Sequence, residues 1–340
     1  MKKLFYLFMV AMCATMFTAC SDDDDKDPLD DDGEGKEGVI TMTTEETYIH
    51  LYVETFNEGE IITIDWGDGD PEEFKSFKVY KDWDEDGEDE IHYVLSTDDI
   101  EHEYSNKNPH IVTIKGNIKG LDCYYNNLTS LNVSGCTALT ELNCYQNNLT
   151  SLNVSGCTAL TDLNCSRNDL TSLDVSKNTK LTELDCGYNN LISLDVSKNT
   201  ALTYLSCSRN NLTSLDVSKN TALILLDCYY NNLTSLNVSG CTALTELECW
   251  DNNLTSLNVS GCTALTDLSC SGNNLTSLDV SKNTALTYLS CSSNNLTSAA
   301  LNQIFRDLPQ VTSGTISIYG NPGTETCDKS IAENKGWRVI

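Results

Sequence analysis

The feature that most constrains this chain is a repeat of 21 residues, which runs from residue 121 to residue 298. The unit reads L-x-C-x-x-N-x-L-T-S-L-[DN]-V-S-x-[CN]-T-x-L-T-x, and nine copies follow one another almost without gaps. Its first leucine recurs in strict register as Leu121, Leu142, Leu163, Leu184, Leu205, Leu226, Leu247, Leu268 and Leu289. A fixed period of this length indicates a solenoid in which each unit packs only against its neighbours.

Each unit begins with the pattern L-x-C, in which buried and variable positions alternate as in a strand with one covered face. Successive units then lay these strands side by side about 4.8 Å apart in a parallel sheet, so nine units form a rod of about 40 Å. The asparagine of the unit, for example Asn147, is expected to turn inward and satisfy backbone groups of its own turn and of the adjacent coil. Leu149, Leu152, Val154 and Leu160 would complete the core of one coil.

Written from the preceding leucine, the unit is LxxLxCxxNxL, which resembles the leucine-rich-repeat family with cysteine at the third leucine position. A coil of 21 residues leaves no room for a full helix on its back, and in this it resembles the internalin-like members with short repeats. The resemblance implies a repeat solenoid that is mostly β, a right-handed coil with a parallel sheet over residues 121–298. It also implies a binding role, without identifying a ligand.

The chain has 16 cysteines, and nine of them share the inward position of the repeat: Cys123, Cys144, Cys165, Cys186, Cys207, Cys228, Cys249, Cys270 and Cys291. Their spacing belongs to the repeat and resembles no zinc or redox motif, so buried, reduced thiols are expected. Two further pairs, Cys136 with Cys157 and Cys241 with Cys262, fall on neighbouring back turns. These pairs are the better candidates for disulfides.

Residues 1–19 read as a signal peptide, because Lys2 and Lys3 precede an apolar stretch over residues 4–17 that is short for a membrane span. The sequence FTAC, which ends at Cys20, resembles a bacterial lipobox and implies lipidation of Cys20 and attachment to the outer membrane. Ordinary cleavage before Cys20, which would give a soluble secreted protein, is the alternative. The acidic run that follows resembles the surface-export signal of one group of Gram-negative bacteria, and residues 20–37 are expected to form a flexible tether.

Residues 38–120 contain short runs with alternating apolar and polar residues, at 47–55, 60–66 and 110–115 among others. This pattern predicts a small antiparallel β-sandwich. The sequence WGDG at 66–69 and the sequence HEY at 102–104 together resemble a polycystic-kidney-disease-type (PKD-like) domain, a family whose members usually act as spacers or caps.

An insertion within this domain holds Asp82, Asp84 and Asp86 with the spacing D-x-D-x-D-G, which resembles the start of a calcium loop. Tyr93 stands where an EF-hand loop has its last glutamate, and the flanking residues favour strands. An acidic hairpin tip is the competing interpretation, and no other cofactor is indicated.

Residues 299–340 are expected to form a small α/β cap, with a helix over residues 299–309, a strand near 315–323 and a second helix over residues 324–335. The open end of a solenoid needs a cap with a polar outer face. The β domain is expected to close the other end, because no linker separates it from the first repeat.

The formal net charge of −29 excludes nucleic acid as a partner, because phosphate binding requires lysine and arginine. Most of this charge lies in residues 20–120, with 31 acidic and 8 basic residues, whereas residues 121–340 hold 19 and 11. No His falls within the repeats, and the sequence shows no catalytic triad, paired catalytic carboxylates or phosphate loop. We therefore expect no enzymatic activity.

The positions that flank the inward leucine and cysteine vary most between units, and they should line the outer face of the sheet. Aromatic and acidic residues gather there in the middle of the solenoid, and we predict that they bind a ligand. The predicted site consists of Tyr204, Leu225, Asp227, Tyr229, Tyr230, Glu246, Glu248 and Trp250. The sequence thus predicts an adhesion or recognition protein with an extracellular protein ligand. A glycan ligand, or a passive spacer with a stabilising ladder of side chains, are the alternatives.

Overall fold

The computed structural model describes residues 38–81 and 90–340. The predicted signal peptide, Cys20, the tether over residues 20–37 and the calcium candidates Asp82, Asp84 and Asp86 lie outside the described residues. Within those residues, no helix combines the length and the apolar character that crossing a bilayer requires.

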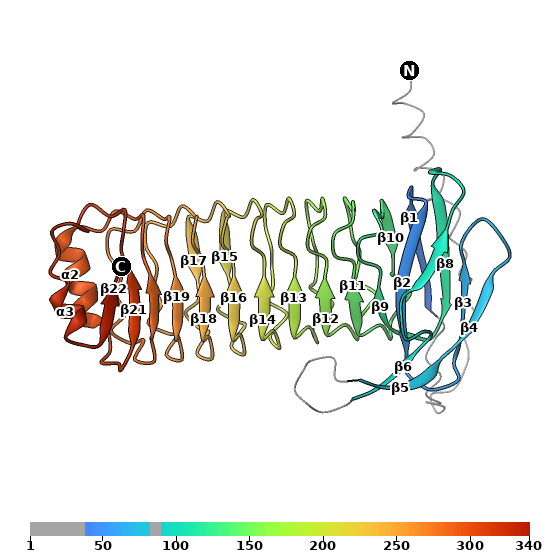
Figure 1. The fold of residues 1–340 in the computed structure, drawn as a ribbon, viewed down its shortest axis with the longest axis horizontal. Coiled ribbons are helices and arrows are strands. Elements are labelled where there is room, and N and C mark those ends of the chain that lie inside the picture. The colour runs from blue at the N-terminus through green and yellow to red at the C-terminus, as the bar shows by residue number, and fades with distance from the viewer. Residues whose placement is uncertain (1–37, 82–89) are drawn as a thin grey trace, which may run out of the picture. The chain divides into compact units, whose positions relative to one another are not determined.

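One short strand from each coil builds a parallel sheet along the solenoid, and Figure 1 shows these strands side by side. The pairing places the first leucine of each coil beside that of the next, as with Leu205 and Leu226. The strands are β9 (Ile118–Asp122), β11 (Glu141–Asn143), β12 (Asp162–Asn164), β13 (Glu183–Asp185), β14 (Tyr204–Ser206), β16 (Leu225–Asp227), β18 (Glu246–Glu248), β19 (Asp267–Ser269) and β20 (Tyr288–Ser290). Two back segments, β15 (Ser214–Asp216) and β17 (Ser235–Asn237), also pair in parallel.

The inward asparagine connects neighbouring coils, as the sequence predicts. The side-chain amide of Asn210 donates to the carbonyl of Cys207 in its own coil at 3.1 Å and to that of Cys186 in the preceding coil at 3.0 Å. Its Oδ1 accepts from the backbone N–H of Leu191 at 2.9 Å. The equivalent asparagines make the same contacts along the solenoid, and this satisfies backbone groups that the 21-residue coil leaves unpaired.

The back turns occur in two forms, which differ at the two positions that follow V-S in the unit. Where the turn reads S-K-N, the asparagine amide donates to two carbonyls of the preceding coil, as Asn220 does to Val196 and Asn199 at 3.0 and 2.8 Å. Where it reads S-G-C, the thiol donates instead, as Cys241 does to the carbonyl of Val217 at 3.3 Å. In the S-G-C turn, the threonine after the cysteine also donates its backbone N–H to the carbonyl of the glycine before the cysteine, and this bond closes the turn.

All the cysteines within the described residues are free thiols, including the two back-turn pairs that were the better disulfide candidates. Burial raises the pKa of Cys136 and Cys262 to about 11 and that of Cys157 and Cys241 to about 12. The interior thiols are fully buried, and burial raises their pKa further. They stay protonated and unreactive, and act as small apolar side chains.

The β domain consists of two antiparallel sheets. The first contains β1 (Gly38–Thr44), β8 (His110–Gly116), β3 (Ile61–Asp65) and β4 (Glu72–Lys75), with β10 (Ser130–Asn132) at its edge. The second contains β2 (Tyr48–Thr55), β7 (Ile100–Glu103), β6 (Glu90–Val94) and β5 (Phe77–Lys81). Apolar side chains of both sheets belong to one buried core that continues into the solenoid.

The first coil joins both sheets of the β domain. Its front strand β9 pairs with β2, and its back strand β10 pairs with β1. The boundary expected between residues 120 and 121 therefore falls inside β9, and the β domain and the solenoid form one compact unit.

The residues that carry the PKD-like resemblance lie together in the β domain. The rings of Trp66 and His102 stack with centroids 4.8 Å apart, and the Tyr104 hydroxyl donates to the carbonyl of Trp66 at 3.0 Å. His102 also contacts the carboxylate of Asp68 at 3.1 Å. These contacts hold the turn after β3 against the end of β7. The motif therefore has a structural role.

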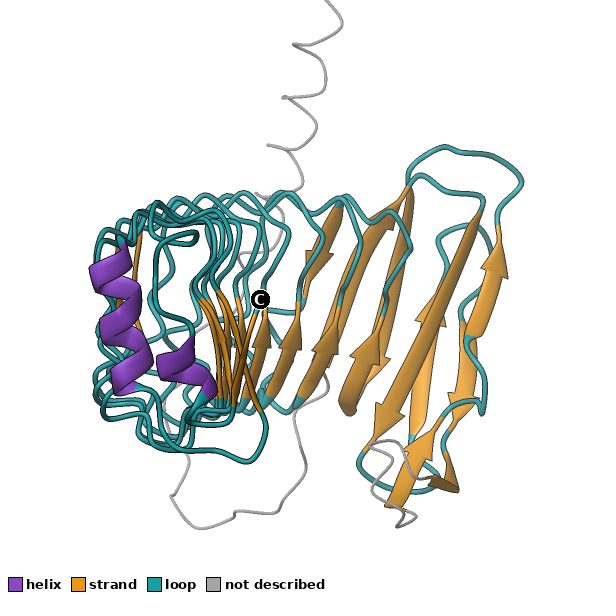
Figure 2. Ribbon diagram, turned by 60° about the vertical axis from the view of Figure 1, so that its left-hand side comes forward, coloured by secondary structure: helices purple, strands orange, loops and turns teal. Residues whose placement is uncertain are grey.

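The carboxyl-terminal segment contains α2 (Ser298–Asp307), β21 (Gly314–Ser317), α3 (Ser330–Glu333) and β22 (Trp337–Val339), and Figure 2 shows both helices at the end of the stack. The helix predicted over residues 324–335 is wrong in extent, because turns occupy most of that range. The solenoid also continues one coil beyond residue 298: β21 pairs in parallel with β20. Asn321 donates to the carbonyls of Cys291 and Ile318 at 2.9 Å, as a repeat asparagine does.

Candidate ligand-binding face

The outer face of the front sheet brings together residues that are 21 positions apart in the sequence. Strands β14, β16 and β18 pair so that Tyr204, Leu225 and Glu246 lie in one row. Asp227 lies opposite Glu248 in the next row. The structure therefore places these five predicted residues on one face.

Directly beyond these strands, three predicted aromatic residues form a cluster. The rings of Tyr229 and Trp250 stack with centroids 4.6 Å apart and an interplanar angle of 9°. Tyr230 meets the edge of Trp250, also at 4.6 Å, and remains 40% exposed. Such packing holds the rings in place before any ligand arrives, which lowers the entropy lost on binding.

The two acids beside the cluster are held in surroundings that disfavour their charge. Burial, together with the nearby Glu246 carboxylate, raises the pKa of Asp227 to about 6. Burial raises the pKa of Glu248 to about 7. A cationic group of a ligand would relieve this repulsion, so the face favours a positively charged partner.

A further exposed residue next to this face, Ile224, was missed by the sequence reasoning. At this position the other coils carry threonine, whose hydroxyl donates to a carbonyl of the preceding coil at 3.0 to 3.3 Å. Ile224 cannot donate, and its side chain is 48% exposed beside Leu225. The sequence signal was ILL where the neighbouring units read TEL or TYL. An apolar side chain that replaces a stabilising contact and faces solvent is typical of a binding surface.

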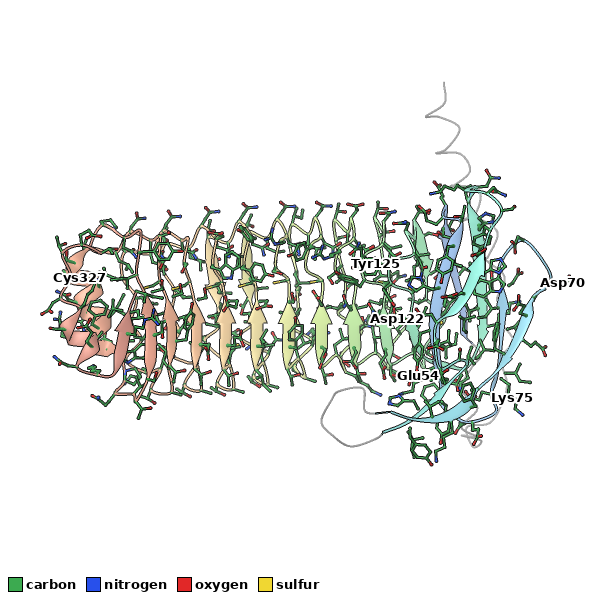
Figure 3. The ribbon with its side chains drawn as sticks, viewed as in Figure 1. Glu54, Asp70, Lys75, Asp122, Tyr125 and Cys327 are labelled. Carbon is green, nitrogen blue, oxygen red and sulfur yellow. The ribbon has the colours of Figure 1, made fainter. Side chains whose placement is uncertain are left out.

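A pocket of about 650 Å³ lies where β2 and β6 meet the first front strands. Its lining includes the acids Glu54, Asp122, Glu141, Asp162, Glu183 and Asp185, and Figure 3 labels Glu54 and Asp122 there. The Nζ of Lys119 lies 3.0 Å from Glu54 and 3.4 Å from Glu141, and burial raises the pKa of Asp122 to about 6. Among the predicted site residues, Tyr204 lines this pocket. The sequence could not reveal the pocket, because it depends on the pairing of β2 with β9.

Over residues 38–81 and 90–340, the structure places no set of three His, Cys, Asp or Glu side chains where they could hold a metal ion. The carboxylates of the front face are spread along separate strands, and their spacing suits several cationic groups of an extended ligand.

Comparison with known protein families finds a match in the repeat region. The sequence family described as Leucine Rich repeat matches residues 145–163. The coils form a leucine-rich-repeat solenoid. A search among curated proteins finds no match.

Several solved structures are similar to this solenoid. The functional domain of InlJ from Listeria monocytogenes, described as including a cysteine ladder, is 35% identical over 63% of this chain and 56% of that chain, with a TM-score of 0.48. The leucine-rich effector YopM from Yersinia pestis is 23% identical over 54% of this chain and 50% of that chain, with a TM-score of 0.46. The internalin InlF of L. monocytogenes is 22% identical over 60% and 74%, with a TM-score of 0.38. The chain thus spans about half the length of the InlJ and YopM chains.

Proposed function

We propose that this protein is exported to the cell surface and binds an extracellular protein through the front face of its solenoid, without catalysis. The observation that carries the proposal is the front patch, which we define as Tyr204, Ile224, Leu225, Asp227, Tyr229, Tyr230, Glu246, Glu248 and Trp250. It combines stacked aromatic side chains, the exposed side chain of Ile224 and half-buried acids, all on or next to the neighbouring strands β14, β16 and β18.

The composition of the front patch favours a protein ligand with basic and apolar side chains. Aromatic anchors at the centre of an interface contribute most of the binding free energy. Asp227 and Glu248 lie close to each other and to Glu246, so a lysine or arginine of the partner would relieve the repulsion between these carboxylates and an acidic surface would add to it.

The place of the protein at the cell surface is proposed from residues 1–37 of the sequence. Lipidation of Cys20 would attach the chain to the outer membrane, and the acidic residues after it would separate the folded unit from the bilayer. A Cys20→Ala variant should remain exported but lose incorporation of a labelled fatty acid.

A binding screen of the full chain against extracellular proteins and glycan arrays tests the proposed function. The test variant is Leu225→Ala with Tyr229→Ala and Trp250→Ala. The matched control is Ile192→Ala with Thr213→Ala and Thr255→Ala, which alters three exposed positions of the back segments.

We expect saturable binding to a protein that the test variant loses and the control retains. Because each anchor contributes roughly 1–2 kcal/mol on truncation, the loss should exceed about a hundredfold. Binding that a free sugar displaces would favour the glycan alternative. Equal binding by both variants would contradict the assignment to the front patch, and absence of saturable binding would favour a spacer.

A further inference from the structure

A line of tyrosine and arginine side chains runs along the turn that follows the front strands. We call it the Tyr–Arg ladder and define it as Tyr125, Tyr145, Arg167, Tyr188, Arg209 and Tyr230. Figure 3 labels Tyr125 in this turn, beyond the strand that carries Asp122. It reaches Trp250 through Tyr230 at one end.

Each arginine of the ladder is stacked between two tyrosines. The guanidinium carbon of Arg167 lies 4.4 Å from the ring centroid of Tyr188 and 5.8 Å from that of Tyr145. The guanidinium carbon of Arg209 lies 4.1 Å from Tyr230 and 5.0 Å from Tyr188. These contacts fix the plane of each guanidinium and cover its faces, so its N–H edge is left for other partners.

Every coil places one residue of this turn in the left-handed region of the backbone. Tyr125, Arg167, Tyr188, Arg209 and Tyr230 all have φ between 50° and 54°, the left-handed region. A residue with a Cβ pays roughly 1–2 kcal/mol there, and glycine avoids this cost. The eighth coil does use glycine at the equivalent position, at residue 272. The turn therefore accepts several residue types at this position, and tyrosine or arginine is not needed to form it.

The two arginines also lack carboxylate partners. None of the ion pairs within the described part of the chain involves Arg167 or Arg209, although the sequence holds 50 acidic residues. A guanidinium edge with free donors binds a carboxylate through two parallel hydrogen bonds. The ladder thus presents two oriented guanidinium groups, which we call forks, and the N–H edge of each can bind an anionic group of a ligand.

The spacing of the forks sets the spacing of those anionic groups. Arg167 and Arg209 are two coils apart, which corresponds to about 10 Å along the sheet. Side chains on one face of an extended peptide recur about every 7 Å, so an acidic peptide strand does not match both forks. Two sugar residues of an extended polysaccharide cover a length similar to the separation of the forks. The Tyr188 hydroxyl between them suits a neutral sugar.

We propose that the Tyr–Arg ladder binds an extended polysaccharide that carries a carboxylate on every second sugar. The polymer lies along the solenoid axis, with successive carboxylates on Arg167 and Arg209 and the intervening sugar against Tyr188. This site goes beyond the proposed protein-binding function and shares Tyr230 with the front patch. The acids of the sheet beside the ladder repel the polymer, so both arginines are needed together.

Titration calorimetry of the full chain with a hyaluronan decasaccharide tests the proposal, because that polymer alternates a uronic acid with a neutral sugar. Dextran serves as a neutral polymer and poly-L-glutamate as an acidic peptide. The variant Arg167→Gln with Arg209→Gln removes both forks. The chain already carries glutamine at this position in the second coil, with the same φ, at residue 146. The control is Arg338→Gln, an exposed arginine of β22.

We expect the decasaccharide to bind and dextran not to bind. The double glutamine variant should lose affinity by at least about tenfold, as expected for the loss of charge-assisted hydrogen bonds, while Arg338→Gln keeps the wild-type affinity. The corresponding double lysine variant should lose most of the affinity, because lysine keeps the charge but lacks the planar fork. Unchanged melting temperatures would show that the variants fold.

Three results would overturn the proposal. These are no binding of the decasaccharide to the wild-type chain, equal binding by the double glutamine variant, and tighter binding of poly-L-glutamate than of the decasaccharide. The last would assign the ladder to an acidic protein segment instead.

Discussion

The Cys-type back turns predict a sharp difference between two glycines that have the same sequence surroundings. A Cβ added at Gly240 would lie 2.0 Å from the carbonyl oxygen of Ser218 in the preceding coil. A Cβ added at Gly135 would meet nothing within 4 Å, because the first coil has no coil before it. Both glycines occur in the sequence VSGCT, and both accept the same backbone bond that closes the turn.

The expected magnitudes follow from these contacts. The Gly240→Ala change must push two coils apart, and overpacking of this kind costs about 1–3 kcal/mol of unfolding free energy or more. The Gly135→Ala change meets no obstacle and restricts the unfolded chain, so it should be neutral or stabilise by about 0.4–1 kcal/mol. The two variants should therefore differ by about 1–4 kcal/mol.

Urea unfolding of the full chain, followed by circular dichroism, measures this difference. The double change Gly240→Lys with Cys241→Asn should restore most of the stability, because it converts the turn to the Asn type that four other coils use. Equal midpoints for Gly240→Ala and Gly135→Ala would refute the steric reasoning. Failure of the double change to restore stability would refute the assignment of two exchangeable turn types.

Three further predictions concern the asparagine ladder and the front patch. Replacing Asn210 with alanine should cost about 3 kcal/mol in urea unfolding, because it leaves several buried backbone groups unpaired, whereas alanine at the exposed Asn211 should cost little. The raised pKa values of Asp227 and Glu248 mean that the folded state binds protons more tightly than the unfolded chain. Their contribution to stability is therefore lost as the pH rises from about 4 to about 7. The variant Asp227→Asn with Glu248→Gln should gain about 1 kcal/mol or more over the wild type at pH 8 and nothing at pH 4, and an equal gain at both pH values would contradict the shifts. Changing Ile224 to threonine should raise the unfolding free energy by about 1 kcal/mol through a new inter-coil hydrogen bond and should weaken ligand binding, and an unchanged affinity would remove this residue from the site.

The sequence predicts the solenoid well because every 21-residue unit must meet the same physical requirements. Leucine and cysteine at alternate positions must face inward, and the inward asparagine must satisfy the turn, so register, burial and hydrogen bonding follow from one period. The adjacency of Leu225 with Tyr204 and Glu246 follows from the same period. The sequence alone therefore predicted most of the front patch.

The ends of the solenoid were less predictable, since the period breaks there. The coil that contains Asn321 follows an insertion that holds α2, and isoleucines replace its leucine and cysteine. The helix expected over residues 324–335 is restricted to Ser330–Glu333, because the segment before it turns around Asn321 instead of continuing a helical period.

Tertiary structure alone decided the features that join segments with no common period. The acidic pocket exists because β2 pairs with β9. The different surroundings of Gly135 and Gly240 depend on what precedes each coil in space. A local pattern specifies which face of a segment is buried, but the neighbour that buries it is chosen by the packing of the whole chain.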